Sequence, residues 1–168
     1  MARLEWAHVV AFDGPEEKML GPEDLLELAP DLRIGIQPYI TLLELHYPVD
    51  VMRVGLKRSA EERTSTSNVA VKRRQHAAGE FRHMTPEHLF LAVHRVDNSV
   101  YYRRLAPEEY RLLTELRAGR SIADALRRAF RESQAPLDEI PAMLRNWFAA
   151  WAELGWLTVR QKSKRGRL

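Results

Sequence analysis

The sequence contains no cysteine, which excludes disulfide bonds, thiolate zinc sites, iron–sulfur clusters and cysteine nucleophiles. Its eight glycines form neither a GxGxxG fingerprint nor a P-loop, so the common nucleotide-binding motifs are absent. No GxSxG elbow marks a nucleophilic serine. No apolar run approaches the roughly 20 residues that span a membrane, and the first residues lack the uninterrupted apolar stretch of a signal peptide. We therefore expect a cytoplasmic protein without a membrane segment.

The six histidines do not form a metal-binding pattern. His88 and His94 lie on one predicted strand at a spacing that separates them by about 20 Å, too far to share one ion. None of the patterns HxH, HxxxH or HExxH occurs. Adjacent carboxylates such as Glu108 and Glu109 point apart and are typical of solvated charge. The sequence therefore predicts a protein that is not an enzyme, with no catalytic residue, no metal site and no cofactor.

The composition is that of an ordinary globular protein, with 45% hydrophobic and 29% charged residues and a net charge of +3. A length of 168 residues favours one domain or two small ones. The pattern predicts the α+β class, in which a small N-terminal α/β segment precedes a winged-helix-like domain. The expected parts are the segment over 1–57, a polar basic loop over 58–84, the winged-helix-like unit over 85–161 and a basic tail over 162–168.

The N-terminal segment alternates between helical and extended patterns. Leu4, Ala7 and Ala11 follow helical spacing, and a proline at the first helical position favours a second helix. The expected elements are helices over 2–12 and 22–28, strands over 32–36 and 40–47, and a short helix over 48–54.

The second half is predicted to form a hairpin, three helices and a closing strand. Asp97 and Asn98 supply the hairpin turn, Pro107 begins a helix that Gly119 ends, and Ser121 caps the next helix. The first of these helices is expected to bury Tyr110, Leu113 and Leu116. The remaining elements are strands over 89–96 and 100–105, a helix over 137–154 and a strand over 156–160.

Clustered arginine and lysine side chains raise the possibility of DNA binding, because phosphate contacts come first from these residues. The helix that would enter the groove, over 137–154, begins with Asp138 and Glu139, which repel phosphate, and it carries one arginine, Arg145. Solvated charge is the ordinary explanation, and DNA binding is the alternative. The clusters are Lys72, Arg73 and Arg74 in the loop, Arg103 and Arg104 on the hairpin, Arg127 and Arg128 on a helix, and the basic tail.

The helix over 137–154 carries more aromatic and apolar side chains than one buried stripe requires. They either fill a core or form the floor of a groove beside the strand over 100–105. If that strand is a sheet edge, its unpaired backbone groups can accept an extended peptide as an added strand. Because side chains alternate along a strand, one of Tyr101 and Tyr102 is expected to pack inward while the other is exposed. The candidate peptide-binding residues are Tyr101, Tyr102, Arg103, Arg104, Met143, Trp147 and Trp151.

Three stretches of the sequence carry a resemblance to a known family. They are ARLEWAHVVAF, LRIGIQPYITLLELHYPVDVMRVG, and LFLAVHRVDNSVYYRRLAPEEYRLLTELRAGRSIADALRRAF with the later LRNWFAAWAELGWLTV. This pattern of apolar positions and turns resembles the C-terminal two-thirds of the HvfC/BufC-like proteins, a family described as a DNA-binding domain. The second half is also similar to PqqD-like peptide-recognition domains. The match runs from Ala2 to Val159 apart from the loop.

The resemblance implies a role as a partner protein. HvfC/BufC-like proteins are typically encoded beside multinuclear iron oxidases that modify cysteine-containing precursor peptides, and they look like non-catalytic partners of the oxidase. In PqqD-like domains a leader peptide adds a strand and leans on the third helix. In the family, DNA binding was suggested for an N-terminal helical domain that has no counterpart in the matched stretch. The role as a partner protein therefore transfers to this sequence better than DNA binding does. We expect a ribosomally made precursor peptide and an iron oxidase as partners, with a DNA-binding regulator as the alternative.

Overall fold

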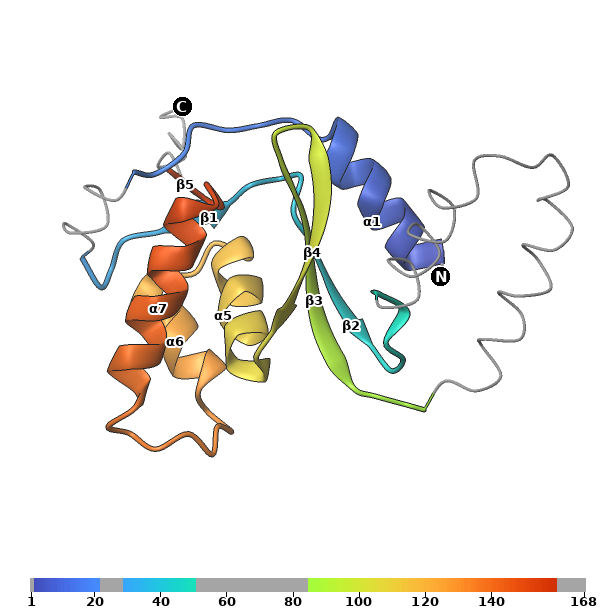
Figure 1. Cartoon of the computed structure of the whole chain (residues 1–168). Coiled ribbons are helices and arrows are strands. Elements are labelled where there is room, and N and C mark those ends of the chain that lie inside the picture. Colours follow the sequence, from blue (N-terminus) through green and yellow to red (C-terminus); the bar gives the residue numbers. More distant parts are fainter. Residues whose placement is uncertain (1, 22–28, 51–84, 160–168) are drawn as a thin grey trace, which may run out of the picture.

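In the residues that the structure describes, 2–21, 29–50 and 85–159 of a computed structural model, a three-stranded antiparallel sheet lies between one helix and a group of three (Figure 1). The strands follow the order β2–β3–β4. Their bounds are Thr41–Leu45 for β2, Leu89–Val96 for β3 and Ser99–Leu105 for β4. Helices and strands together confirm the expected α+β class.

Helix α1 (Ala2–Asp13) covers one face of this sheet. Leu4, Ala7 and Ala11 are buried, as their spacing predicts. They pack against sheet side chains such as Leu91 to form the smaller of two hydrophobic clusters. This cluster attaches the N-terminal helix to strands that come much later in the sequence.

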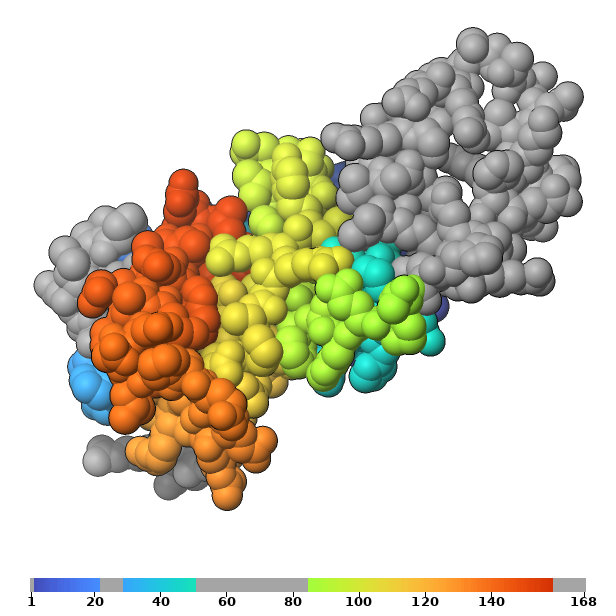
Figure 2. Space-filling model, turned by 60° about the horizontal axis from the view of Figure 1, so that its bottom comes forward, coloured from blue at the N-terminus to red at the C-terminus, as the bar shows by residue number. Residues whose placement is uncertain are grey.

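Three helices cover the opposite face of the sheet, and α5 lies between the strands and the other two helices (Figure 2). Leu112, Trp151 and Trp156 are fully buried there and share the larger hydrophobic cluster with Ala92 of β3. The sheet therefore has a core on each of its faces. The helices are α5 (Pro107–Arg117), α6 (Ile122–Ala129) and α7 (Ile140–Glu153).

A second, two-stranded sheet pairs the first and the last of the described strands. Strand β1 (Ile34–Ile36) pairs antiparallel with β5 (Leu157–Val159). The pairing continues past β1, where the backbone N–H of Gln37 donates to the Trp156 carbonyl oxygen at 2.8 Å. The buried Gln37 side-chain amide also exchanges two hydrogen bonds of 2.9 Å with the backbone of Glu17. The predicted segments 1–57 and 85–161 thus contribute strands to the same sheets.

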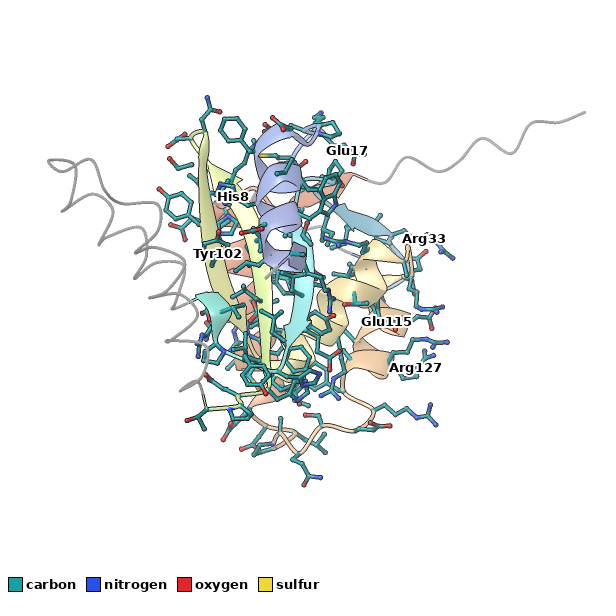
Figure 3. All side chains as sticks on the ribbon, turned by 90° about the vertical axis from the view of Figure 1, so that its right-hand side faces the viewer. His8, Glu17, Arg33, Tyr102, Glu115 and Arg127 are labelled. Atoms are coloured by element: carbon teal, nitrogen blue, oxygen red, sulfur yellow. The ribbon has the colours of Figure 1, made fainter. Side chains whose placement is uncertain are left out.

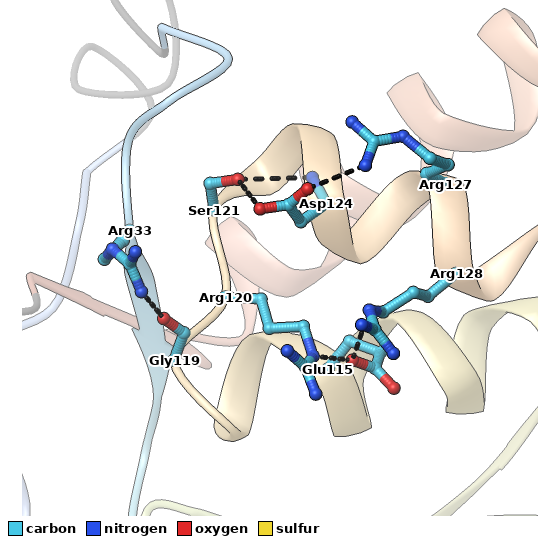
Figure 4. Close-up of polar contacts among 8 residues, drawn as sticks. All are labelled: Arg33, Glu115, Gly119, Arg120, Ser121, Asp124, Arg127 and Arg128. Carbon is cyan, nitrogen blue, oxygen red and sulfur yellow. Dashed lines mark hydrogen bonds and ion pairs between the residues drawn. The ribbon is translucent and has the colours of Figure 1, made fainter.

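Local sequence signals explain where several elements begin and end. Asp97 and Asn98 have φ values of 45° and 60°, which a two-residue hairpin turn of type I′ requires. Pro107 lies in the first turn of α5, where its missing N–H costs nothing. The Ser121 side chain accepts a hydrogen bond from the backbone N–H of Asp124 at 3.2 Å, so the predicted cap of α6 is confirmed (Figure 4).

Some expectations differ from the structure. Helix α7 begins at Ile140 rather than at Leu137, which is 85% exposed and lies in a turn closed by the hydrogen bond from the Glu139 N–H to the Pro136 carbonyl oxygen. Strand β1 is shorter than the expected strand over 32–36, and all three of its residues are buried within the larger core. Tyr110 is only partly buried, whereas Leu112 takes a core position. The expected helix over 22–28 and residues 51–54 of the short helix lie outside the described residues.

The C-terminal end of α1 is fixed by Arg95 of β3. Its guanidinium donates hydrogen bonds to the carbonyl oxygens of Phe12 at 3.0 Å and Gly14 at 2.7 Å, and it lies over the Tyr39 ring. These carbonyls have no partner within the helix, so a cation at this position stabilises them. The turn after α1 is tightly packed as a result.

Replacing Gly14 with alanine is expected to destabilise the fold. An added Cβ would lie 2.5 Å from the Val10 carbonyl oxygen and 2.8 Å from the Cβ of Tyr39. Such overpacking costs roughly 1–3 kcal/mol of the free energy of unfolding, measured by urea denaturation. Glu17→Ala is the control, because its side chain is exposed and such changes cost less than about 0.5 kcal/mol. Equal stability of the two variants would contradict the packing described at Gly14.

Candidate functional site

Strand β4 is an edge strand in the part of the chain that the structure describes, since it pairs with β3 alone. Val96 and Ser99 close the two-residue turn, so their backbone N–H and C=O groups point toward each other. Along β4, the N–H and C=O groups of successive residues then point alternately away from β3 and toward it. The backbone N–H and C=O groups of Val100 and Arg104 therefore point away from β3. An extended chain can pair with groups arranged in this way.

The side chains of β4 divide between the two faces of the sheet. Tyr101 and Arg103 lie on the face of the three helices, whereas Tyr102 and Arg104 lie on the face of α1. Tyr101 is 50% exposed and Tyr102 is partly buried, as the alternation of side chains predicts. The four candidate residues on this strand therefore form two separate pairs rather than one site.

Arg103 belongs to a buried polar network between β4 and two helices. Its guanidinium donates to the Glu109 carboxylate at 3.1 Å, and the same oxygen accepts a hydrogen bond of 3.0 Å from the Trp151 indole. The Glu109 side chain is 4% exposed, and that of Arg103 is 29% exposed. The guanidinium also lies over the Trp156 ring, 5.5 Å from its centre. This network connects β4 with α5 and α7.

Arg104 and Tyr102 already have partners within the protein. The Arg104 guanidinium binds both carboxylate oxygens of Asp50, at 2.8 and 3.2 Å, and that of Glu87 at 2.8 Å. Hydrogen bonding to Asp50 raises the pKa of Arg104 above its usual range. The Tyr102 hydroxyl lies 3.1 Å from Nδ1 of His8 on α1 (Figure 3). These contacts attach β4 to the N-terminal half of the chain.

The three candidate residues on α7 contribute to the larger core. Trp151 is fully buried, Trp147 is 9% exposed, and Met143 is partly buried against the same cluster. The two indole rings stack with centres 6.4 Å apart. Trp151 cannot touch a ligand directly and acts through its hydrogen bond to Glu109. Of these three residues, which were predicted to form the floor of a peptide groove, Met143 is the most accessible to solvent.

The expectation that Glu109 carries solvated charge is wrong, because this side chain is buried. The signal was present in the sequence: Glu109 stands three, four and seven residues before Leu112, Leu113 and Leu116, which are all buried on the same side of α5. A carboxylate on the apolar side of a helix requires buried donors, and Arg103 and Trp151 supply them.

The structure describes only some of the basic clusters that suggested DNA binding. Lys72, Arg73 and Arg74 lie outside the described residues. On α6, Arg127 pairs with Asp124 at 2.9 Å, and Arg128 lies 3.9 Å from Glu115, which also binds Arg120 (Figure 4). The described arginines near α6 are therefore largely balanced by carboxylates.

Within the described ranges, no three histidine, aspartate or glutamate side chains are grouped closely enough to hold a metal ion. His46 and His88 stack with ring centres 5.2 Å apart, and Nε2 of His88 lies 2.8 Å from the Glu44 carboxylate. Nor does any described helix combine the length and apolar character needed to cross a bilayer.

No family model matches the chain, and no curated protein matches it. The resemblance to HvfC/BufC-like proteins therefore stays a prediction.

Replacing Glu109 with leucine is expected to lower the free energy of unfolding by about 2–4 kcal/mol. The change leaves the Trp151 N–H buried without its acceptor and removes the partner of the partly buried Arg103. Thr114→Ala, an exposed position on the same helix, is the control in the same urea denaturation experiment. A cost of Glu109→Leu no greater than that of the control would show that the network contributes nothing.

Stability is expected to fall in mild acid because of His94 on β3. This ring is 4% exposed, lies against Trp156 at 4.9 Å, and its Nδ1 is among the buried atoms without a hydrogen-bond partner in the described structure. Burial lowers the pKa of His94 below its usual 6.5; a hydrogen bond with the Arg95 backbone partly opposes this shift, and the Arg103 cation adds to it. The unfolded chain therefore binds this proton first, and stability is lost as the pH falls below about 6.5.

The measurement compares the wild type with His94→Phe by urea denaturation at about pH 7.5 and 5.5. The wild type is expected to lose more stability between these values than the variant. Acid sensitivity that is identical in both proteins would contradict this assignment to His94.

Proposed function

We propose that this protein is a cytoplasmic, non-catalytic accessory protein that binds an extended segment of a ribosomally synthesised precursor peptide along the outer edge of β4. The observation that carries the proposal is the position of β4 at the edge of its sheet among the described residues. Backbone hydrogen bonds to such an edge supply affinity, and flanking side chains supply selectivity. Tyr101 and Arg103 are the partly exposed side chains beside this edge on the helical face.

The order of the elements supports the same function. The β3–β4 hairpin is followed along the chain by three helices, and the resemblance to PqqD-like domains implies this order of hairpin and helices. Trp151 on the third of these helices contacts β4 indirectly, through Glu109 and Arg103. A peptide added to β4 would therefore lie beside side chains whose positions depend on that helix.

The second part of the proposal is that the complex docks on a multinuclear iron-dependent oxidative enzyme. It is supported by the resemblance to HvfC/BufC-like proteins. In this arrangement the oxidase supplies the chemistry, and the present chain supplies the binding site that holds the peptide.

DNA binding is less well supported by the described residues. Arg103 and Arg104 both have carboxylate partners, and the arginines of α6 lie close to Asp124 and Glu115. A DNA-binding surface needs cations that are free to replace the counterions of phosphate.

Replacing Val100 with proline is expected to weaken peptide binding about tenfold or more. The proline removes an N–H that points out from β4, and its ring obstructs the incoming strand. Because this N–H does not pair with β3, proline is tolerated there as on other strand edges. The probes are fluorescent copies of the short peptides encoded next to this gene, and binding is followed by fluorescence anisotropy.

Val100→Ala is the matched control, because it removes the same partly buried side chain but keeps the N–H. It is expected to melt at a similar temperature to Val100→Pro and to bind peptide nearly as well as the wild type. Equal peptide affinity of the two variants would rule out strand addition at β4. Binding to duplex DNA alone, weakening at least about tenfold between 50 and 200 mM salt, would favour the regulator instead.

A further inference from the structure

Arg103 and Tyr101 give the outer edge of β4 a particular chemical character on its helical face. Both side chains lie on this face, two residues apart in an extended strand. A strand added beside β4 would place two of its own side chains directly next to them. The properties of these two neighbours therefore predict which peptide sequences fit, provided that the proposed function is correct.

Arg103 has hydrogen-bonding capacity that the protein does not use. A guanidinium carries five N–H donors, and in the described structure the carboxylate of Glu109 accepts from one nitrogen only. The side chain is 29% exposed, so part of it is open to solvent beside β4. A second carboxylate can therefore bind Arg103 without displacing the first.

Glu109 does not occupy the position that such a ligand would take. Its carboxylate is 4% exposed and faces inward, where it also binds the Trp151 indole. It fixes the Arg103 guanidinium in place over the Trp156 ring. A guanidinium held in this way loses less conformational entropy when a carboxylate binds, which favours a fork-shaped contact.

Among the described residues, the other face of β4 offers no comparable site for an anion. Arg104 is bound by two carboxylates, from Asp50 and Glu87, and a third would meet an excess of negative charge. The preference for an acidic side chain therefore belongs to the helical face alone.

Tyr101 defines the second position. Its side chain is 50% exposed and its ring lies 5.9 Å from the buried His94 ring. An aromatic side chain at the edge of a sheet pairs well with an apolar or aromatic neighbour on the adjacent strand. The sheet is antiparallel throughout the described strands, and antiparallel pairing is the slightly more stable arrangement.

From these contacts we infer that the segment bound along β4 carries an acidic side chain beside Arg103 and, two residues later, an apolar side chain beside Tyr101. The order is acidic residue, any residue, apolar residue, because an antiparallel strand meets Arg103 before Tyr101. Arg103 is thus a specificity-determining residue, and Glu109 and Trp151 are positioning residues behind it. This inference rests on the proposed function and names the class of peptide that it would take.

The test uses synthetic peptides as long as β4, about seven residues, with capped ends. The first probe is Thr-Thr-Glu-Thr-Phe-Thr-Thr. The second has Gln in place of Glu, and the third exchanges the positions of Glu and Phe. Each is titrated into the full chain, labelled with ¹⁵N, and the amide signals of Val100 and Arg104 report binding.

The protein variants are Arg103→Gln, Arg104→Gln and Val100→Pro. Arg103→Gln keeps a donor for Glu109 but removes the cation, and Arg104→Gln removes a cation from the opposite face. The change from Glu to Gln in the probe is expected to weaken binding to the wild type and to Arg104→Gln about five- to tenfold. The same change is expected to alter binding to Arg103→Gln by less than about twofold.

The remaining outcomes separate failure of this inference from failure of the proposed function. If the Glu and Gln probes bind the wild type equally, or if their difference persists in Arg103→Gln, the acidic preference is wrong. If the acidic preference is wrong but Val100→Pro abolishes binding of both the Glu and the Gln probe, the proposed function still stands. A preference for the exchanged probe overturns the antiparallel order. Failure of all three probes to bind the wild type contradicts the inference and the proposed function together.

Discussion

The structure depends on one constraint, which is that β3 must be buried on both of its faces. It is the central strand of the sheet, and its residues Leu91 to His94 are almost completely inaccessible to solvent. Leu91 and Val93 contribute to the core beneath α1, whereas Ala92 contributes to the core beneath the three helices. A shift of one residue in the pairing would exchange these two sets of side chains, so the register is strongly specified.

This constraint reaches the candidate site through the hairpin. Because β4 is paired with β3 residue by residue, the alternation of β3 fixes which β4 side chains face the helices. Arg103 consequently meets Glu109, and Arg104 meets Asp50. Two adjacent arginines that look alike in the sequence thus have different surroundings. Arg103 pairs with one buried carboxylate, whereas the more exposed Arg104 pairs with two.

Much of the fold could be predicted from local signals, because turns, caps and helix starts depend on neighbouring residues. The hairpin turn at Asp97 and Asn98 and the cap at Ser121 are examples. The site was harder to predict. Alternation showed that Tyr101 and Tyr102 face opposite ways, but which of them is exposed depends on the distant α1. The burial of Glu109 depends on a tryptophan 42 residues later, and only its place among the leucines of α5 pointed to it.

The pairing of β1 with β5 has a consequence for how this chain reaches its folded state during synthesis. Ile34 lies opposite Val159. Strand β1, the first described strand to be made, therefore cannot pair until β5, the last described strand, has been made. Contacts between such distant residues slow folding, because a long loop must close before they form. Since the chain is made from its N-terminus, β1 and Gln37 stay without their β5 and Trp156 partners until nearly the whole described chain has been translated. In the cell, β1 and Gln37 therefore reach their final contacts only after β5 has been made, rather than stepwise as the earlier elements are translated.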